Sequence, residues 1–221
     1  YQRLQESNPS PHGGLLHVPG EWDIISASPE LFIHRSGSHI TTSPIKGTAA
    51  LNQEMLAKDH SENIMIVDLM RNDLSHVAVP GTVRVPHLLR REEHPGLAHL
   101  VSDVTCDLRS DVTWSELLAA TLPPGSVSGA PKSSALEVIQ RMEPTPRGMY
   151  CGVFGWVDAD TQAAELAVGI RTFSQKPDGD GARITFGTGA GITWGSDPVH
   201  EWNETELKAH RLLSVAAGLD V

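Results

Sequence analysis

The sequence has few cysteines, little positive charge and no long apolar run. Cys106 and Cys151 are its only cysteines and show no CxxC spacing, so neither a disulfide scaffold nor a zinc site is indicated, and a reducing cytoplasm fits best. The 27 Asp and Glu residues outnumber the 17 Lys and Arg residues, which form no basic block, and the formal net charge is -10. That balance argues against nucleic acid and anionic membranes as partners. No apolar run approaches the roughly 20 residues of a membrane-spanning helix.

The usual nucleotide-phosphate motifs are also missing. Neither GxGxxG nor GxxxxGKS or GxxxxGKT occurs. Two glycine-rich segments do occur, PPGSVSGAPK at 123–132 and GTGAGI at 187–192. Their backbone N–H groups suit the binding of a carboxylate or a phosphate, although an ordinary tight turn explains each segment equally well.

Length and hydrophobic content favour one globular domain. With 221 residues, 39% of them hydrophobic, the chain can bury a sizeable core. Strands interleaved with helices along the whole length predict a single α/β domain over residues 1–221. Residues 1–14 are polar, lack a starting methionine and do not resemble a signal peptide, so we expect the chain to begin inside a larger protein.

Turn-forming residues separate several β-rich runs. Ser-Pro and Ser-Gly-Ser punctuate three short runs near the N-terminus, which predicts an antiparallel meander. Its expected strands are Trp22–Ser28, Leu31–His34 and His39–Ser43. Further strands are expected at about 150–157, 163–173 and 182–187.

Four segments carry helix signals. Residues 51–74 contain neither Gly nor Pro and show spaced apolar residues. Thr113 is a suitable N-cap for a second helix, and Pro131 suits the first turn of a third. The four expected helices run over 51–74, over 114–122, from Pro131 to just before Pro144, and from Pro198 to Ala217.

Two groups of carboxylates lie at helical spacing. Glu201, Glu204 and Lys208 fall at i, i+3 and i+7, so they share one face of the last helix. Asp59 and Glu62 are likewise three residues apart, on the helix expected over 51–74. If the two carboxylate pairs meet, their oxygens suit Mg²⁺, which would keep several waters and meet a carboxylate of the substrate. From spacing alone, two solvated helix faces explain the same pattern.

Three further side chains are candidates for acid, base or nucleophilic chemistry. Lys46 lies just before Gly-Thr at the end of a strand-rich run, where it is either a surface charge or a nucleophile. Glu30 would supply an acid or a base if it lies opposite Lys46. His99 lies in an expected strand, where a lone histidine is more often a packed core residue than a catalyst.

Eight motifs, in order along the chain, resemble the chorismate-binding family, which includes anthranilate, aminodeoxychorismate, isochorismate and salicylate synthases. They are SPELF (28–32), PIKGT (44–48), IVDLMRNDL (66–74), HLVSDV (99–104), PPGSVSGAPKSSALEVI (123–139), RGMYCGVFGW (147–156), AVGIRTF (167–173) and GTGAGITWGSDPVHEWNETELKA (187–209). The resemblance implies an α/β (α+β) fold of two antiparallel sheets packed against each other, with outer helices and the active site between the sheets. The family's N-terminal part has no counterpart in the 221 residues.

The resemblance assigns roles to the residues already singled out. It implies Mg²⁺ coordination by Glu62 and Glu204, with Asp59 and Glu201 as water-mediated neighbours. His99 would lie beside the ring and the enolpyruvyl group of chorismate.

The resemblance also implies a binding site for the two carboxylates of chorismate. Thr48 and Ser126 would line this site. The residues expected to bind the carboxylates are Tyr150, Arg171, Gly189, Gly191 and Lys208. Arg171 and Lys208 would supply the local positive charge that an acidic protein needs for a dianion.

The lysine of PIKGT separates branches of the family. Aminodeoxychorismate synthases characteristically have lysine at this position, whereas anthranilate and salicylate synthases generally have alanine. The resemblance implies that Lys46 attacks C2 of chorismate while Glu30 assists departure of the C4 hydroxyl. Ammonia from a glutamine amidotransferase, either a separate subunit or a fused domain, would then add at C4 and give 4-amino-4-deoxychorismate for 4-aminobenzoate and folate synthesis.

Two other functions stay open. An anthranilate synthase shares almost every motif but eliminates pyruvate. A chorismate-binding module without catalysis is the second alternative, because Ser75 and His76 replace the Gly and Arg of the family's NDLGR pattern. The full candidate set favours an enzyme; it comprises Glu30, Lys46, His99, Glu62 and Glu204.

Overall fold

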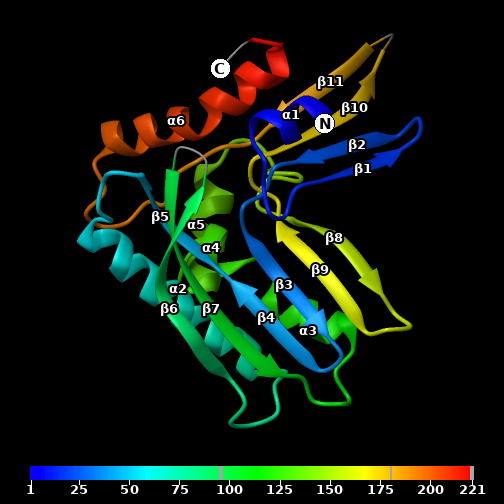
Figure 1. The fold of residues 1–221 in the computed structure, drawn as a ribbon, viewed down its shortest axis with the longest axis vertical. Helices are drawn as coiled ribbons and strands as arrows, with labels where there is room; N and C mark the ends of the chain where they lie inside the picture. Colours follow the sequence, from blue (N-terminus) through cyan, green and yellow to red (C-terminus); the bar gives the residue numbers. More distant parts are fainter. Residues whose placement is uncertain (95–96, 180, 220–221) are drawn as a thin grey trace. The chain divides into compact units, whose positions relative to one another are not determined.

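The computed structural model describes residues 1–94, 97–179 and 181–219 (Figure 1). The chain divides into two compact units. The terminal unit comprises Tyr1–Pro29, Arg147–Phe154 and Ala167–Val221. The central unit comprises Glu30–Pro146 and Gly155–Leu166.

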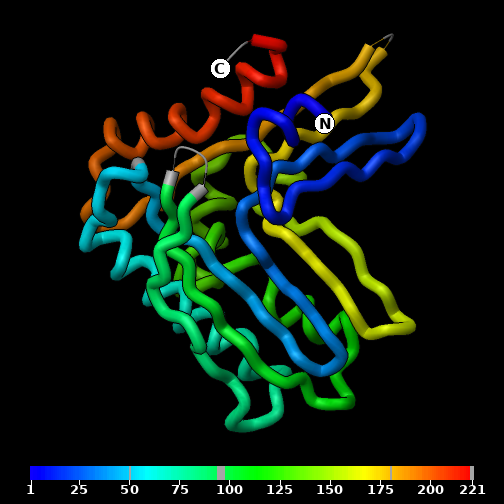
Figure 2. Tube along the Cα trace, in the orientation of Figure 1, coloured from blue at the N-terminus to red at the C-terminus, as the bar shows by residue number. Residues whose placement is uncertain are grey.

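The terminal unit is a four-stranded antiparallel sheet with two helices. Its sheet has the order β1-β2-β10-β11, and the two hairpins lie side by side through the pairing of β2 with β10 (Figure 2). Its elements are α1 (Gln2–Ser7), β1 (Gly14–Val18), β2 (Trp22–Ser26), β10 (Thr172–Asp178), β11 (Gly181–Phe186) and α6 (Pro198–Ala217). A core of Leu4, Ala27, Phe173, Leu212 and Val215 joins α1 and α6 to the sheet.

A second sheet of seven strands runs mostly through the central unit. The strand order is β5-β7-β4-β3-β9-β8. The strands β4 and β5 pair with successive stretches of the same edge of β7, and β6 pairs with the opposite edge of β7. The strands are β3 (Leu31–Ser36), β4 (His39–Ser43), β5 (Ile45–Ala50), β6 (Arg84–His94), β7 (Leu97–Asp107), β8 (Val153–Asp158) and β9 (Ala163–Val168).

The helices of the central unit include α2, the longest of them, which contacts β5, β6 and β7 (Figure 1). They are α2 (Ala57–Ser75), α3 (Trp114–Thr121), α4 (Gly125–Ser128) and α5 (Lys132–Met142). The buried stripe of α2 is Asn63, Ile66, Val67, Met70, Asp73 and Leu74, close to the 3.6-residue period of an amphipathic helix. Both α3 and α4 contact α2.

Most of the expected elements are confirmed. The chain is a mixed α/β protein with two antiparallel sheets. Thr113 caps α3 with a capping box to Glu116, and α6 has the bounds that the sequence predicts. That the two sheets pack against each other, and that residues 1–221 form one domain, stay predictions.

Three expectations were wrong. The three N-terminal strands do not form a meander, because β2 pairs with β1 and β10, whereas β3 and β4 form a hairpin in the other sheet. The first long helix begins at Ala57 rather than residue 51, because β5 continues up to Ala50 and residues 51–56 form a turn and an irregular link to the helix. The expected strand over 163–173 is broken into β9 and β10 near Arg171, whose φ is 50°.

Candidate active site

Glu30 is a buried carboxyl group directly before β3. It is 3% exposed and accepts hydrogen bonds from the Ser126 hydroxyl and from the backbone N–H of Ile45. Burial raises the pKa of Glu30 to about 7, although the two hydrogen bonds and the positive charge of Lys46 each lower it. A carboxyl group with this pKa is protonated about half the time at neutral pH, so it can act as a general acid.

A bulge in β5 lies between Lys46 and Thr48. The register of β5 against β7 shifts by one residue there, which makes Gly47 the extra residue. Gly47 has a φ of 80°, and a Cβ on it would lie 2.7 Å from the Cβ of Asp59. Glycine is therefore needed both for the backbone conformation and for the close approach of β5 to the start of α2.

His99 lies opposite Thr48 in the β5–β7 register. It is 2% exposed, and its Nδ1 is 3.1 Å from the Oγ1 of Thr48. This hydrogen bond orients the imidazole relative to the strand that carries Lys46.

Asp59 and Glu62 lie in the first two turns of α2, and both are partly buried. The Oδ2 atom of Asp59 accepts a hydrogen bond of 2.9 Å from the backbone N–H of Leu56, so this carboxylate caps the helix. Because Asp59 also borders Gly47, the start of α2 lies against the PIKGT strand.

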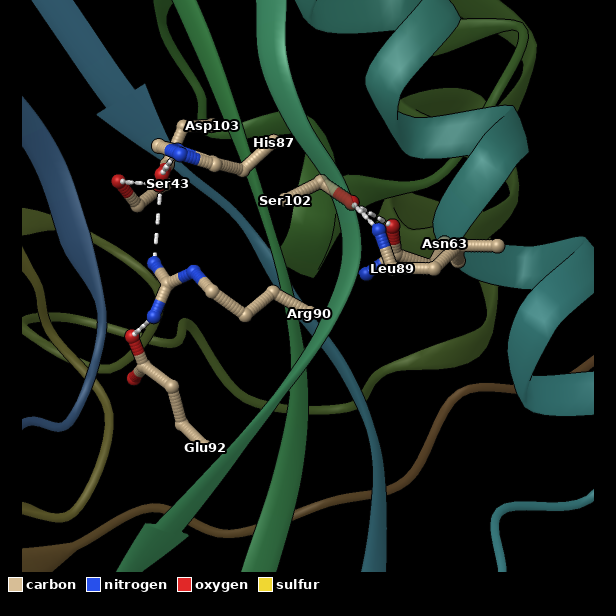
Figure 3. A network of polar contacts seen from close by, with 8 residues as sticks. All are labelled: Ser43, Asn63, His87, Leu89, Arg90, Glu92, Ser102 and Asp103. Carbon is tan, nitrogen blue, oxygen red and sulfur yellow. Dashed lines mark hydrogen bonds and ion pairs between the residues drawn. The ribbon is translucent and has the colours of Figure 1, made fainter.

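Buried hydrogen bonds fix α2 on the sheet directly after Glu62 (Figure 3). Asn63 is 0% exposed; its amide nitrogen donates to the Leu100 carbonyl at 3.0 Å and its amide oxygen accepts from the Ser102 hydroxyl at 2.5 Å. Ser102 in turn accepts from the backbone N–H of Leu89 at 2.9 Å. These bonds set the position of α2 relative to β6 and β7.

A second polar cluster in Figure 3 joins β4, β6 and β7 around Asp103. Asp103 accepts from the Ser43 hydroxyl at 2.7 Å and from the Arg90 guanidinium at 3.2 Å, and it lies 2.9 Å from Nδ1 of His87. Burial alone would raise the pKa of Asp103, but these partners outweigh it and hold the pKa below its usual value. The cluster stabilises the pairing of the three strands.

In the terminal unit, Lys208 and Glu204 interact on α6. The Lys208 ammonium is 2.6 Å from Oε1 of Glu204 and donates to the Gly189 carbonyl at 3.2 Å. Glu201, one turn earlier, is 4% exposed. Lys208 therefore connects the glycine-rich segment to the carboxylate face of α6.

The Tyr150 ring packs against the glycine-rich segment. A Cβ on Gly187 would lie 2.3 Å from Cγ of Tyr150, and a Cβ on Gly189 would lie 2.7 Å from its hydroxyl. The absence of side chains at these glycines therefore makes room for the ring. The Arg147 guanidinium lies 5.8 Å from the ring centroid, within the range of a cation–π contact.

Arg171 occupies the break between β9 and β10. Its φ is 50°, and its carbonyl accepts a hydrogen bond of 3.0 Å from the backbone N–H of Ala27. Burial lowers the pKa of its guanidinium, which nevertheless remains charged at neutral pH. The side chain is therefore a partly buried cation in the terminal unit.

The predicted site residues are divided between the two units. Those of the central unit are Glu30, Lys46, Thr48, Asp59, Glu62, His99 and Ser126, and those of the terminal unit are Tyr150, Arg171, Gly189, Gly191, Glu201, Glu204 and Lys208. The described contacts connect Glu30 with Ser126, Thr48 with His99, and Lys208 with Glu204 and Gly189.

The described contacts do not bring together the carboxylates that were predicted to bind Mg²⁺. Glu62 belongs to the central unit and Glu204 to the terminal unit, so their convergence on one cation stays a prediction. Within residues 1–94, 97–179 and 181–219, no three His, Cys, Asp or Glu side chains gather as a preformed metal centre would.

Comparison with known proteins identifies the family. The family model for chorismate binding enzymes matches residues 1–214. The chain belongs to this family. It is 40% identical to anthranilate synthase component 1 of Synechocystis sp., over 99% of this chain and 46% of that protein. It is 38% identical to aminodeoxychorismate synthase component 1 of Salmonella typhimurium, over 96% and 48%.

A solved structure of the family agrees with the fold. Anthranilate synthase component I from Streptococcus pneumoniae superposes with a TM-score of 0.83 and 33% identity, over 96% of this chain and 48% of that one. The chain thus spans about half the length of the chorismate binding enzymes that it matches. Because two kinds of synthase are similar at nearly equal identity, overall similarity does not select the product.

Four residues that sequence reasoning missed also support the site: Asn63, Ser102, Asp73 and Lys132. A signal for two of them was present, since Asn63 and Asp73 are the polar members of the buried stripe of α2. No helix in the described part of the chain is long and apolar enough to cross a bilayer. Cys106 and Cys151, both described, are buried and form no disulfide.

Proposed function

We propose that this chain is the catalytic half of an aminodeoxychorismate synthase component I, which aminates chorismate at C4. The observation that carries the proposal is that Lys46 lies within electrostatic reach of the Glu30 carboxyl group. The lysine that separates this branch of the family lies close enough to a buried carboxyl group to lower its pKa, and that pKa is still about 7.

In the first step, the Lys46 ammonium gives up a proton to solvent, and the resulting amine attacks C2 of chorismate. The ring double bonds shift, the C4–O bond breaks, and Glu30 gives its proton to the departing hydroxyl, which leaves as water. The Ser126 hydroxyl and the Ile45 N–H then stabilise the Glu30 carboxylate, because both donate hydrogen bonds to it.

In the second step, ammonia attacks C4, the double bonds return, and the C2–N bond to Lys46 breaks. The product keeps its enolpyruvyl group. A glutamine amidotransferase partner would supply the ammonia, and a reducing cytoplasm suits the two buried cysteines.

We assign the binding of the two chorismate carboxylates to residues of the terminal unit. Arg171 can hold a carboxylate with two parallel hydrogen bonds, and Lys208 adds a second cation. The Tyr150 hydroxyl and the glycine-rich segment with Gly189 and Gly191 would supply further donors. His99, oriented by Thr48, would contact the ring or the enolpyruvyl group.

The carboxylate set also fits Mg²⁺, since oxygen donors are the ligands that this ion prefers. Glu62 and Glu204 would hold the ion, with Asp59 and Glu201 as water-mediated neighbours. When bound, Mg²⁺ would orient the ring carboxylate and offset its charge.

Product analysis separates this proposal from the two alternatives. The protein is incubated with chorismate, Mg²⁺ and an ammonium salt, the products are identified by mass spectrometry, and pyruvate is measured with lactate dehydrogenase. We expect 4-amino-4-deoxychorismate without pyruvate. Anthranilate with one equivalent of pyruvate would overturn the proposal in favour of an anthranilate synthase, and chorismate binding without any product would indicate a non-catalytic module.

A further inference from the structure

Ser126, which donates to Glu30, lies on a loop that is anchored to α2 at two points. The loop runs from the end of α3 to the start of α5 and includes α4. At the first anchor, Gly125 packs so closely on α2 that a Cβ there would lie 2.6 Å from Cδ2 of Leu69 and 2.8 Å from Cε of Met70. Ser126 is the next residue.

The second anchor is an ion pair between Lys132 and Asp73. Lys132 is the first residue of α5, and its ammonium donates to Oδ2 of Asp73 on α2 at 2.6 Å and to the Thr121 carbonyl at the end of α3 at 3.2 Å. Their side chains are only 17% and 8% exposed. One ammonium group thus fixes both ends of the loop and ties them to α2.

The partial burial of this pair makes it a firm anchor. Charge attraction is stronger where water is excluded, and removal of one partner leaves a buried charge without compensation. Burial raises the pKa of Asp73 above its usual value, although Lys132, His76 and Asn72 each lower it. By contrast, the ion pair of Arg71 with Asp68 on the same helix is 53% and 65% exposed and is screened by solvent.

We propose that the Asp73–Lys132 ion pair is a positioning element that holds the Ser126 hydroxyl in hydrogen-bonding distance of the Glu30 carboxyl group. The catalytic consequence rests on the proposed function, in which Glu30 is the acid. The positioning itself does not, because it concerns the contact of Ser126 with Glu30 whatever the product. Lys46 acts on the Glu30 carboxyl group through its charge. In the proposal, the Asp73–Lys132 ion pair acts on Glu30 only through the position of Ser126.

The test measures the protonation of Glu30 without turnover. The carboxyl carbon of Glu30 is followed by ¹³C NMR across pH in glutamate-labelled protein, with Glu30→Gln identifying the signal. Ser126→Ala removes one hydrogen bond to the charged form and should raise the pKa of Glu30 by about one unit. The neutral double variant Asp73→Asn with Lys132→Gln leaves no unpaired buried charge, and it should also raise the pKa of Glu30.

Combining the variants distinguishes positioning from general destabilisation. In the Ser126→Ala background, Asp73→Asn with Lys132→Gln should produce no further shift, because the contact through which the pair acts is already lost. Lys132→Arg, which keeps the charge, should preserve the wild-type titration. Arg71→Met, which breaks the exposed pair on the same helix, should also leave it unchanged.

The activity profile gives an independent readout. With a higher pKa, Glu30 stays protonated to higher pH, so the high-pH limb of kcat should move upward in both Ser126→Ala and the neutral double variant, while the KM for chorismate changes less than kcat. An unchanged Glu30 titration in the neutral double variant, or a full additional shift in the Ser126→Ala background, would overturn the proposal. A different reaction product would overturn the proposed function but leave the titration result valid.

Discussion

The Glu30 carboxyl group is buried within electrostatic reach of the Lys46 ammonium, and burial nevertheless raises its pKa to about 7. The two groups come from neighbouring positions of the sheet, because Glu30 precedes β3 and accepts from the N–H of Ile45 at the start of β5. The start of β3, the end of β4 and the start of β5 therefore place a candidate acid and a candidate nucleophile close together.

The raised pKa of Glu30 should appear in the stability of the protein. A carboxyl group whose pKa rises from 4.5 unfolded to about 7 folded binds an extra proton in the folded state between these values. The free energy of unfolding should therefore fall by about 3 kcal/mol from this group as pH rises from below 4.5 to above 7. Glu30→Gln should lack that fall. Urea unfolding of both proteins at pH 5 and pH 8 measures the difference, and equal pH dependence would show that Glu30 does not titrate as the structure indicates.

Lys46→Ala should abolish covalent capture of the substrate and reduce amination at C4 by at least about a hundredfold, because it removes the amine that we propose attacks C2. The fold should remain, since Lys46 is only partly buried. Product formation from chorismate and ammonium chloride is measured, with the exposed lysine variant Lys176→Ala as the control. Wild-type rates of aminodeoxychorismate formation by Lys46→Ala would exclude covalent catalysis by this lysine.

Arg171→Lys should weaken chorismate binding even though it keeps the charge. A guanidinium holds a carboxylate with two parallel hydrogen bonds, and the loss of one charge-assisted bond costs roughly 1.5–3 kcal/mol, or at least about tenfold in KM. Arg183→Lys is the matched control, because Arg183 is an exposed arginine of the same unit. An unchanged KM in Arg171→Lys would remove this residue from the substrate site.

Glu62→Gln and Glu204→Gln should each raise the Mg²⁺ concentration needed for half-maximal activity. If both carboxylates hold one ion, the double variant should be much less impaired than the product of the two single effects predicts. Glu206→Gln, an exposed position on the same helix as Glu204, should behave as wild type. Independent, multiplicative effects of Glu62→Gln and Glu204→Gln would argue against a shared ion.

The elements that the sequence predicted well have local signals. Thr113 with Glu116 forms a capping box, and Asp197 caps α6 by accepting from the N–H groups of Val199 and His200. Sheet membership carries no such local signal. Pro29 separates β2 from β3, yet nothing in the neighbouring residues indicates that the chain changes sheets there, because pairing partners such as β10 lie far along the sequence.

The candidate site was only partly predictable for the same reason. Motif resemblance pointed to Glu30, Lys46 and His99, but the burial that sets the pKa of Glu30 depends on tertiary packing. The PIKGT glycine is explained by the approach of α2 at Asp59, which the sequence spacing does not reveal. The Asp73–Lys132 contact joins residues 59 positions apart and required the structure.

The central claim is that Lys46 forms a bond to chorismate beside an acid that removes its C4 hydroxyl. Intact-mass analysis of the protein, incubated with chorismate and Mg²⁺ in the absence of ammonia, tests this most directly. The account predicts a mass increase equal to chorismate less one water, located on Lys46 by peptide mapping and absent from Lys46→Ala. No adduct on the wild-type protein, with anthranilate and pyruvate formed once ammonia is added, would contradict it.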